Sequence, residues 1–247
     1  NKCREAEYRF GTTGTLDGTQ THELVLQGLF GKIYNVTTTK KLQDNDTLSK
    51  LNISVLLLNY PESVRKEFGK REYHDELDFI VKHEGRNKLI KNLALDLKGN
   101  TLVLFQYVEK HGKPLFELIR NGAAKERKVF YVSGQVESSD REVIRQIVET
   151  QKNSIIVASL GTFSTGINIR NLHNIIFASP SKSQVRVLQS IGRSLRKSDD
   201  GSDATLYDIA DDLHWKSREN FTLTHSAERI KIYVKEQFNY DIHEVKL

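Results

Sequence analysis

Residues 155–197, IIVASLGTFSTGINIRNLHNIIFASPSKSQVRVLQSIGRSLRK, hold two apolar strands and a basic helix in succession. The runs Ile155–Ala158 and Ile175–Ala178 have the length and composition of strands that are covered on both faces. A loop rich in Gly, Ser and Thr, Ser159–Gly166, follows the first strand. The spacing of apolar residues in Ser181–Lys197 predicts a helix. This succession is typical of an α/β fold with a parallel sheet.

The alternation of helix and strand continues on both sides of this stretch. Thr101–Phe105 (TLVLF) is a nearly continuous apolar strand, and the amphipathic helix before it, Leu89–Leu97, ends ahead of Gly99. The charged segment 61–84 gives only a weak helical signal. Further helices are predicted around 115–119, 143–148 and 226–238, and further strands at Lys128–Val132 and Thr205–Ile209. We therefore expect a parallel sheet with helices on both faces, joined by right-handed crossovers.

The first fifty residues have a different character. A short helix is predicted at Thr21–Leu29, and an irregular polar stretch, 37–50, separates it from the apolar strand Ile53–Leu58. We place a domain boundary near residue 50. Residues 1–50 and 51–247 are then expected to be separate units.

The composition excludes several classes of protein. The chain has 247 residues, 38% of them hydrophobic and 28% charged, and no apolar run approaches the roughly 20 residues of a membrane span. A net charge of +5 gives weak support to a polyanionic partner. The single cysteine, Cys3, rules out a disulfide framework and fits a cytoplasmic location. Because the chain begins with Asn1 and contains no methionine, we expect it to be a fragment.

The predicted basic helix presents its charge on one face. Gln189, Arg193 and Arg196 follow one another at i, i+4 and i+7, with apolar residues on the opposite side. Residues 181–197 contain five Lys and Arg side chains and no carboxylate. Arginine suits a phosphate because its planar fork donates two parallel hydrogen bonds and stays charged. The alternative interpretation is a solvated basic face.

A second candidate site lies where the predicted strands end. Ligands of open parallel sheets bind beyond the carboxyl ends of the strands. Gln106, Ser133, Gly134 and the loop Ser159–Asn168 all occupy that edge in the predicted topology. The hydroxyl groups and backbone amides of this loop are suited to phosphate oxygens of a nucleotide or a nucleic-acid backbone. A merely capped turn is the alternative for the loop.

Five short motifs occur in the order that is typical of superfamily 2 helicases, and the chain resembles that family. The motifs are TGT at 13–15, LVLF at 102–105, VSG at 132–134, IIVAS to STGIN at 155–168, and QSIGRSLR at 189–196. The resemblance covers about residues 8–210. It implies a second RecA-like domain, preceded by the last strand of a first one. The GR-x-LR form of the last motif resembles the form found in the branch that holds DNA-repair and restriction translocases.

The resemblance implies a function and a set of roles. The implied function is remodelling of branched DNA by unwinding and branch migration, in recombination, repair and replication, driven by ATP with Mg²⁺. Branched or single-stranded DNA would be the partner, with an RNA–DNA hybrid as another substrate. Carried over by motif, Arg193 and Arg196 would be catalytic at the γ-phosphate, Gln189, Gly166 and Asn168 would bind nucleotide, Gln106, Ser133, Gly134 and Thr162 would bind nucleic acid, and Thr13, Gly14 and Thr15 would couple the two sites.

Other chemistry is missing from the sequence. There is no G-x-x-x-x-G-K-[ST] phosphate loop, since Gly31-Lys32 and Gly112-Lys113 lack its other residues, and there is no DEAD-type acidic quartet. We expect both on an upstream RecA-like domain, so that this chain alone does not hydrolyse ATP. The eight histidines lack metal-ligand spacing, and no metal site is predicted. Adjacent carboxylates seldom converge on one site, so we expect Asp211 and Asp212 to be solvated.

Two further hypotheses stay open. The chain would be a standalone DNA-binding or inhibitory module if its fold took no part in ATP turnover. It would be the motor part of a restriction enzyme if a nuclease motif lay elsewhere. The upstream sequence separates these hypotheses, because a phosphate loop there favours the helicase motor.

Overall fold

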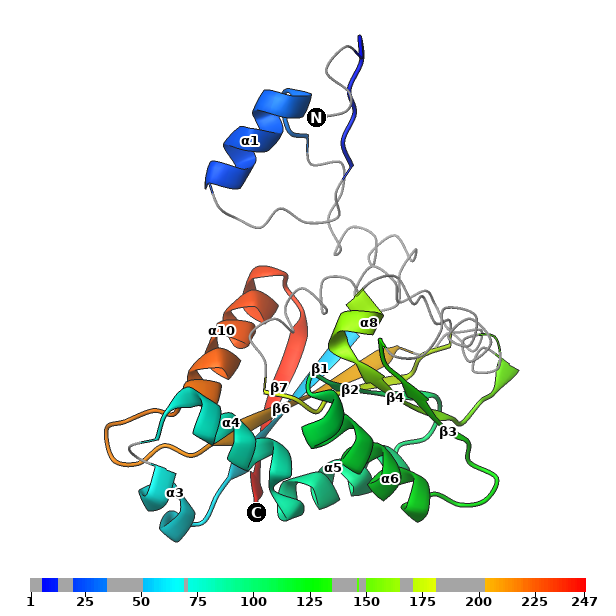
Figure 1. The fold of residues 1–247 in the computed structure, drawn as a ribbon, viewed down its shortest axis with the longest axis vertical. Coiled ribbons are helices and arrows are strands. Elements are labelled where there is room, and N and C mark those ends of the chain that lie inside the picture. The colour runs from blue at the N-terminus through cyan, green and yellow to red at the C-terminus, as the bar shows by residue number, and fades with distance from the viewer. Residues whose placement is uncertain are drawn as a thin grey trace.

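The structure, a computed structural model, describes residues 6–12, 20–34, 51–68, 71–134, 146, 150–164, 171–180 and 203–247. Within these ranges the chain forms a seven-stranded sheet in which every neighbouring pair is parallel (Figure 1). The strands in spatial order are β3 (Val129–Val132), β4 (Ile155–Ser159), β2 (Thr101–Phe105), β5 (Asn174–Phe177), β6 (Ala204–Asp212), β1 (Leu51–Asn59) and β7 (Asn239–Lys246). The predicted parallel sheet is confirmed.

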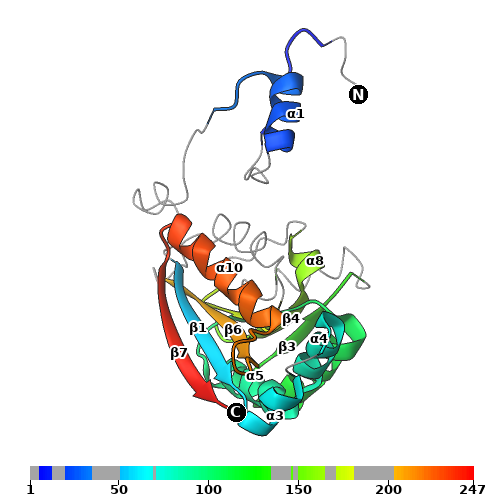
Figure 2. The same ribbon diagram turned by 90° about the vertical axis from the view of Figure 1, so that its left-hand side faces the viewer.

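Helices cover both faces of this sheet. One core cluster joins apolar strand residues to α4 (Tyr73–Lys82), α5 (Glu84–Asp96) and α6 (Lys113–Gly122). The other core cluster joins the opposite strand face to α8 (Leu160–Ser164) and α10 (Phe221–Lys235). Figure 1 shows α8 and α10 above the sheet and α4, α5 and α6 below it, and Figure 2 shows α10 alongside β1 and β6. Three adjacent interior strands, β4, β2 and β5, are buried at every position, as their continuous apolar sequences predict.

Three elements differ from the predictions. The charged segment after β1 forms two helices, α3 (Glu62–Phe68) and α4, where only a weak signal was present. The predicted Gly/Ser/Thr loop contains the short helix α8, because the Ser159 hydroxyl accepts the Thr162 backbone N–H at 3.3 Å and caps its first turn. The last strand, β7, was not predicted.

Helix α10 begins five residues before the predicted start. The buried Glu76 carboxylate of α4 accepts hydrogen bonds from the backbone N–H groups of Phe221 and Thr222, at 3.0 and 2.7 Å. These amides belong to the first turn, where helical N–H groups lack partners in their own helix. A carboxylate 146 residues away in sequence therefore extends the helix toward its N-terminus.

A π-helix, Val108–Gly112, follows β2 and leads directly into α6. The backbone N–H of Gly112 bonds the Tyr107 carbonyl at 2.8 Å. A Cβ atom at Gly112 would lie 2.4 Å from the Phe105 ring, closer than side-chain contacts allow, so glycine lets the π-helix pack against the end of β2. Such wide turns occur often at functional sites.

The N-terminal helix α1 (Gln20–Phe30) forms where it was predicted and ends at Gly31, whose φ of 83° suits glycine. None of its residues is buried, and it stands clear of the sheet in Figures 1 and 2. Residues 35–50 lie outside the described ranges, so the domain boundary near residue 50 stays a prediction. No helix in the described ranges is both long enough and apolar enough to span a membrane.

Candidate nucleic-acid interface

Three adjacent strands bring the predicted nucleic-acid residues to one edge of the sheet. Val132 of β3 pairs with Ala158 of β4, and Ser159 of β4 pairs with Phe105 of β2. Ser133 and Gln106 directly follow these paired residues, on strands that neighbour β4 at about 4.8 Å. A Cβ atom at Gly134 would lie 3.9 Å from Thr162 Oγ1, so these two residues are close in space.

The four residues differ in what they offer to a ligand. Gln106 and Gly134 are exposed, whereas Ser133 and Thr162 are buried. The Thr162 hydroxyl lies 2.7 Å from the Ser159 hydroxyl, within the cap of α8. The Gln106 side chain and the Gly134 backbone therefore form the accessible part of this edge. Nucleic-acid contact by all four residues stays a prediction.

The Gln106 backbone is fixed by the neighbouring strand. Its N–H donates to the Ser179 hydroxyl at 2.9 Å, and Ser179 follows the end of β5. His111 of the π-helix places its Nδ1 atom 3.2 Å from the same hydroxyl. His111 and Ser179 are fully buried. Burial, with a smaller effect from the Arg86 charge, lowers the pKa of His111 to about 3, so the ring is neutral at neutral pH.

This buried imidazole makes stability depend on pH. In the unfolded chain a histidine takes up its proton near pH 6.5, whereas folded His111 stays neutral until about pH 3. The unfolded state therefore binds more protons in this window, and stability falls as the pH is lowered through it. We expect His111→Asn to flatten the dependence of the unfolding free energy on pH by up to about 1.4 kcal/mol per pH unit.

Urea unfolding of the chain between pH 4 and 7 measures this slope. His243→Asn, at an exposed position, is the matched control and should keep the slope of the unsubstituted chain. Identical slopes for the His111→Asn variant and the unsubstituted chain would contradict a neutral buried imidazole.

Asp211 and Asp212 were expected to be solvated, and that prediction was wrong, because Asp211 is fully buried and Asp212 is only 8% exposed. Arg86 donates from Nε and Nη2 to the two carboxylate oxygens of Asp211, at 2.8 and 3.0 Å, and from Nη1 to the Ala178 carbonyl at 2.7 Å. The Tyr60 hydroxyl also donates to Asp211, at 2.9 Å. Burial and the Asp211 charge raise the pKa of Tyr60 well above its usual value.

One local signal pointed to this network. Arg86, Ile90 and Ala94 are spaced by four residues, and all three are buried on one face of α5. A charged residue in such a stripe requires a buried partner. A second buried pair lies on the opposite face of β6, where Asp208 accepts from Arg229 Nε and Nη2, each at 2.9 Å.

The remaining predicted site residues lie outside the described ranges. They are Thr13, Gly14, Thr15, Gly166, Asn168, Gln189, Arg193 and Arg196. The whole predicted helix 181–197 and the helix around 143–148, apart from Gln146, are outside as well. Their roles stay predictions. Within the described ranges, no three His, Cys, Asp or Glu side chains gather as metal ligands would.

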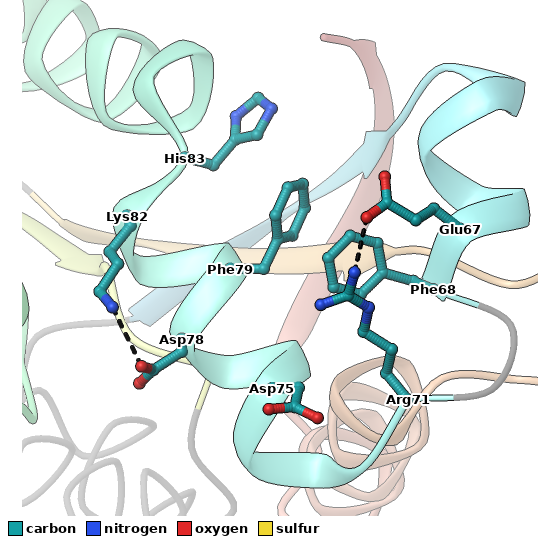
Figure 3. A pocket seen from close by; sticks show the side chains of 8 residues that line it. All are labelled: Glu67, Phe68, Arg71, Asp75, Asp78, Phe79, Lys82 and His83. Carbon is teal, nitrogen blue, oxygen red and sulfur yellow. Dashed lines mark hydrogen bonds and ion pairs between the residues drawn. The ribbon is translucent and has the colours of Figure 1, made fainter.

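A separate open pocket of about 440 Å³ lies between the end of α3 and α4 (Figure 3). Phe68 and Phe79 give it an apolar floor, with ring centroids 4.1 Å apart. Its charges largely pair with each other, as Arg71 bonds Glu67 at 2.6 Å and Lys82 bonds Asp78 at 3.0 Å. None of the predicted site residues lines this pocket.

A comparison with protein families shows which family this part of the chain matches. Residues 84–198 match the helicase conserved C-terminal domain, from the first turn of α5 through the arginine stretch. Residues 84–198 therefore resemble a helicase C-terminal domain. The matched region contains the edge formed by Gln106, Gly134 and Thr162, as well as Arg193 and Arg196. The resemblance to superfamily 2 helicases is confirmed.

The relatives of this helicase domain extend the match to the whole chain. The ATP-dependent DNA helicase UvsW of Enterobacteria phage T4 is 36% identical over 260 residues, covering 100% of this chain and 50% of the relative. The crystal structure of T4 UvsW superposes with a TM-score of 0.69 over 92% of this chain and 45% of that chain. The chain therefore spans about half the length of the curated relative that it matches.

More distant structures share the fold. The DNA-bound Type ISP restriction-modification enzyme LlaBIII has a TM-score of 0.58 at 15% identity, covering 89% of this chain and 17% of that chain. Mss116p, bound to single-stranded RNA and AMP-PNP, has a TM-score of 0.56 at 12% identity, covering 95% of this chain and 40% of that chain. At such identities the likeness shows the RecA-like fold alone and carries no information about the substrate.

Proposed function

We propose that this chain is the C-terminal motor half of an ATP-dependent DNA helicase that remodels branched DNA by unwinding and branch migration in recombination, repair and replication, acting in the cytoplasm. The observation that carries the proposal is the 36% identity to an ATP-dependent DNA helicase over the whole chain. The helicase C-terminal domain within it supports a motor role. Branched or single-stranded DNA is the proposed partner, with an RNA–DNA hybrid as an additional substrate.

The proposed ATP site is shared with an upstream domain. Arg193 and Arg196 would contact the γ-phosphate and stabilise the charge that spreads over its oxygens as the bond breaks. Gln189, Gly166 and Asn168 would contact the nucleotide beside them. The phosphate loop and the carboxylate that binds Mg²⁺ would lie upstream, because this sequence has no G-x-x-x-x-G-K-[ST] stretch and no DEAD-type acidic quartet.

The exposed surface of the first residues supports an upstream partner. Large apolar side chains before residue 35 face solvent, namely Tyr8, Phe10, Leu24, Val25, Phe30 and Tyr34. An apolar surface rimmed by polar residues is typical of an interface. We assign residues 1–50 to the end of the first RecA-like domain and its linker, with Thr13, Gly14 and Thr15 coupling the DNA and ATP sites.

The proposed DNA contact can be tested on this chain alone. Phosphate contacts release counterions, so the affinity for a forked DNA duplex should fall steeply between 50 and 200 mM salt, about 10³-fold or more if six or more phosphates are contacted. Gln106→Ala removes a neutral donor at the exposed edge. It should weaken binding about threefold to tenfold at every salt concentration and leave the salt slope unchanged.

Fluorescence anisotropy with labelled forked and single-stranded DNA measures both quantities. Asn121→Ala, an exposed amide at the far end of α6, is the matched control and should bind like the unsubstituted chain. Salt-insensitive binding would count against a DNA-backbone interface. Equal affinities for the Gln106→Ala and Asn121→Ala variants would remove Gln106 from that interface.

A further inference from the structure

The chain that enters the arginine stretch is held by polar groups from two other parts of the fold. The Ala178 carbonyl accepts a hydrogen bond from Arg86, at the start of α5. The Ser179 hydroxyl accepts the Gln106 backbone N–H and contacts His111. Pro180 and Ser181 follow at once, and the predicted arginine helix begins at Ser181. The entry to the arginine stretch is therefore fixed from the side of α5 and from the side of β2.

The link to Gln106 continues the pairing of two strands beyond their ends. Strands β2 and β5 pair through Leu104 and Phe177, and the Ala178 N–H donates to the Leu104 carbonyl at 3.0 Å. At the next position the Ser179 side chain replaces a backbone acceptor and receives the Gln106 N–H at 2.9 Å. Ser179 is thus a direct link between the proposed DNA contact and the chain that leads to the proposed ATP contact.

His111 fixes the orientation of the Ser179 hydroxyl. A serine hydroxyl has one proton to donate and two lone pairs to accept with. When the neutral ring carries its proton on Nε2, the Ser179 hydroxyl accepts from Gln106 and donates its own proton to His111 Nδ1, 3.2 Å away. The neutral imidazole suits this role, because a doubly protonated ring has no acceptor. The π-helix holds the ring in place, with Gly112 packed against Phe105.

We propose that Ser179, oriented by His111, is a positioning residue that couples DNA contact at Gln106 to the placement of the arginine stretch. This inference rests on the proposed function. DNA bound at the Gln106 edge would hold the loop after β2, and the Ser179 bond would carry that restraint to the chain entering residue 181. The side chains of Ser179 and His111 do not touch nucleotide in this role. Loss of the bond should weaken the response of ATP turnover to DNA.

The test uses this chain joined to its upstream sequence, with ATP hydrolysis measured without DNA and over a titration of forked DNA. Ser179→Ala should lower the ratio of DNA-stimulated to DNA-free turnover about tenfold, the effect of one lost hydrogen bond of ordinary strength. It should also raise the DNA concentration for half-maximal stimulation. Ser154→Ala is the matched control, because Ser154 is equally buried and bonds Asn100 at 2.9 Å at the opposite end of the sheet. The Ser154→Ala variant should keep the ratio.

A pair of His111 variants tests the same link independently of the folding of Ser179→Ala. His111→Asn offers an amide oxygen near the position of Nδ1 and should keep most of the stimulation ratio. His111→Leu removes the acceptor and should lower the ratio as Ser179→Ala does. Equal ratios for His111→Asn and His111→Leu would overturn the role of His111.

Arg193→Ala in the same protein separates the inference from the function on which it rests. If Arg193→Ala abolishes turnover while the Ser179→Ala and Ser154→Ala variants have the same ratio, the coupling role of Ser179 is overturned and the motor stands. If Arg193→Ala leaves turnover intact, the proposed motor itself fails. A lowered ratio in Ser179→Ala alone, with Arg193→Ala inactive, supports both.

Discussion

Arg193→Ala is expected to lower DNA-stimulated ATP hydrolysis by a factor on the order of 10³ in the protein that joins this chain to its upstream sequence. The guanidinium would stabilise negative charge on the phosphoryl oxygens only as the bond breaks, so the loss falls on turnover. Arg196→Ala should behave alike. Arg193→Lys keeps a charge but loses the two parallel donors, and it should restore only a small part of the rate.

Steady-state ATPase assays with forked DNA measure the rate, and a fluorescent ATP analogue shows that nucleotide still binds. Arg120→Ala, an exposed arginine of α6, is the control and should retain full turnover. Full turnover in both the Arg193→Ala and Arg196→Ala variants would contradict the motor. The fold would then be better explained as a nucleic-acid-binding module that takes no part in hydrolysis.

Asp211→Ala is expected to lower the unfolding free energy of this chain by about 3–5 kcal/mol. The substitution leaves the Arg86 guanidinium fully buried without its counter-charge. Breaking a buried pair costs more than the pair contributes, because the remaining charge keeps its desolvation penalty. Replacing both partners, in Arg86→Met with Asp211→Leu, should recover much of the loss.

Urea unfolding gives the free energies for this comparison. Glu67→Ala breaks the exposed pair with Arg71 and serves as the control, with an expected change below about 1 kcal/mol. A change of similar size in the Asp211→Ala variant would mean that the network contributes no more than a surface pair.

The interior strands were predictable because burial on both faces leaves a local trace. β2, β4 and β5 are apolar at nearly every position, and their bounds agree with the predictions within one residue. β7 leaves no such trace, since this edge strand is mostly exposed and alternates polar with apolar residues irregularly. The early start of α10 depends on Glu76, a partner too distant in sequence for a local pattern to show.

The same division applies to the candidate site. The shared edge of Gln106, Gly134 and Thr162 followed from the rule that parallel strands end together. The burial of Asp211 did not follow, because its partner Arg86 lies 125 residues away. The bond between Ser179 and Gln106 spans 73 residues, and a lone serine after a strand carries no signal of it. Long-range polar pairs leave little imprint on neighbouring residues in the sequence.

The two carboxylates of β6 have a mechanical consequence for a motor domain. Asp208 fastens α10 to one face of the strand through Arg229. Asp211 fastens α5 to the other face through Arg86, which also donates to the Ala178 carbonyl just after β5. Apolar layers can slide past each other when side chains change rotamer. Two parallel, charge-assisted hydrogen bonds resist such sliding, because they weaken as soon as their geometry is distorted. β6 is thus joined by a bidentate ion pair to a helix on each face of the sheet. A force applied to the helices on either face would then move the sheet and both helical layers together as a rigid body.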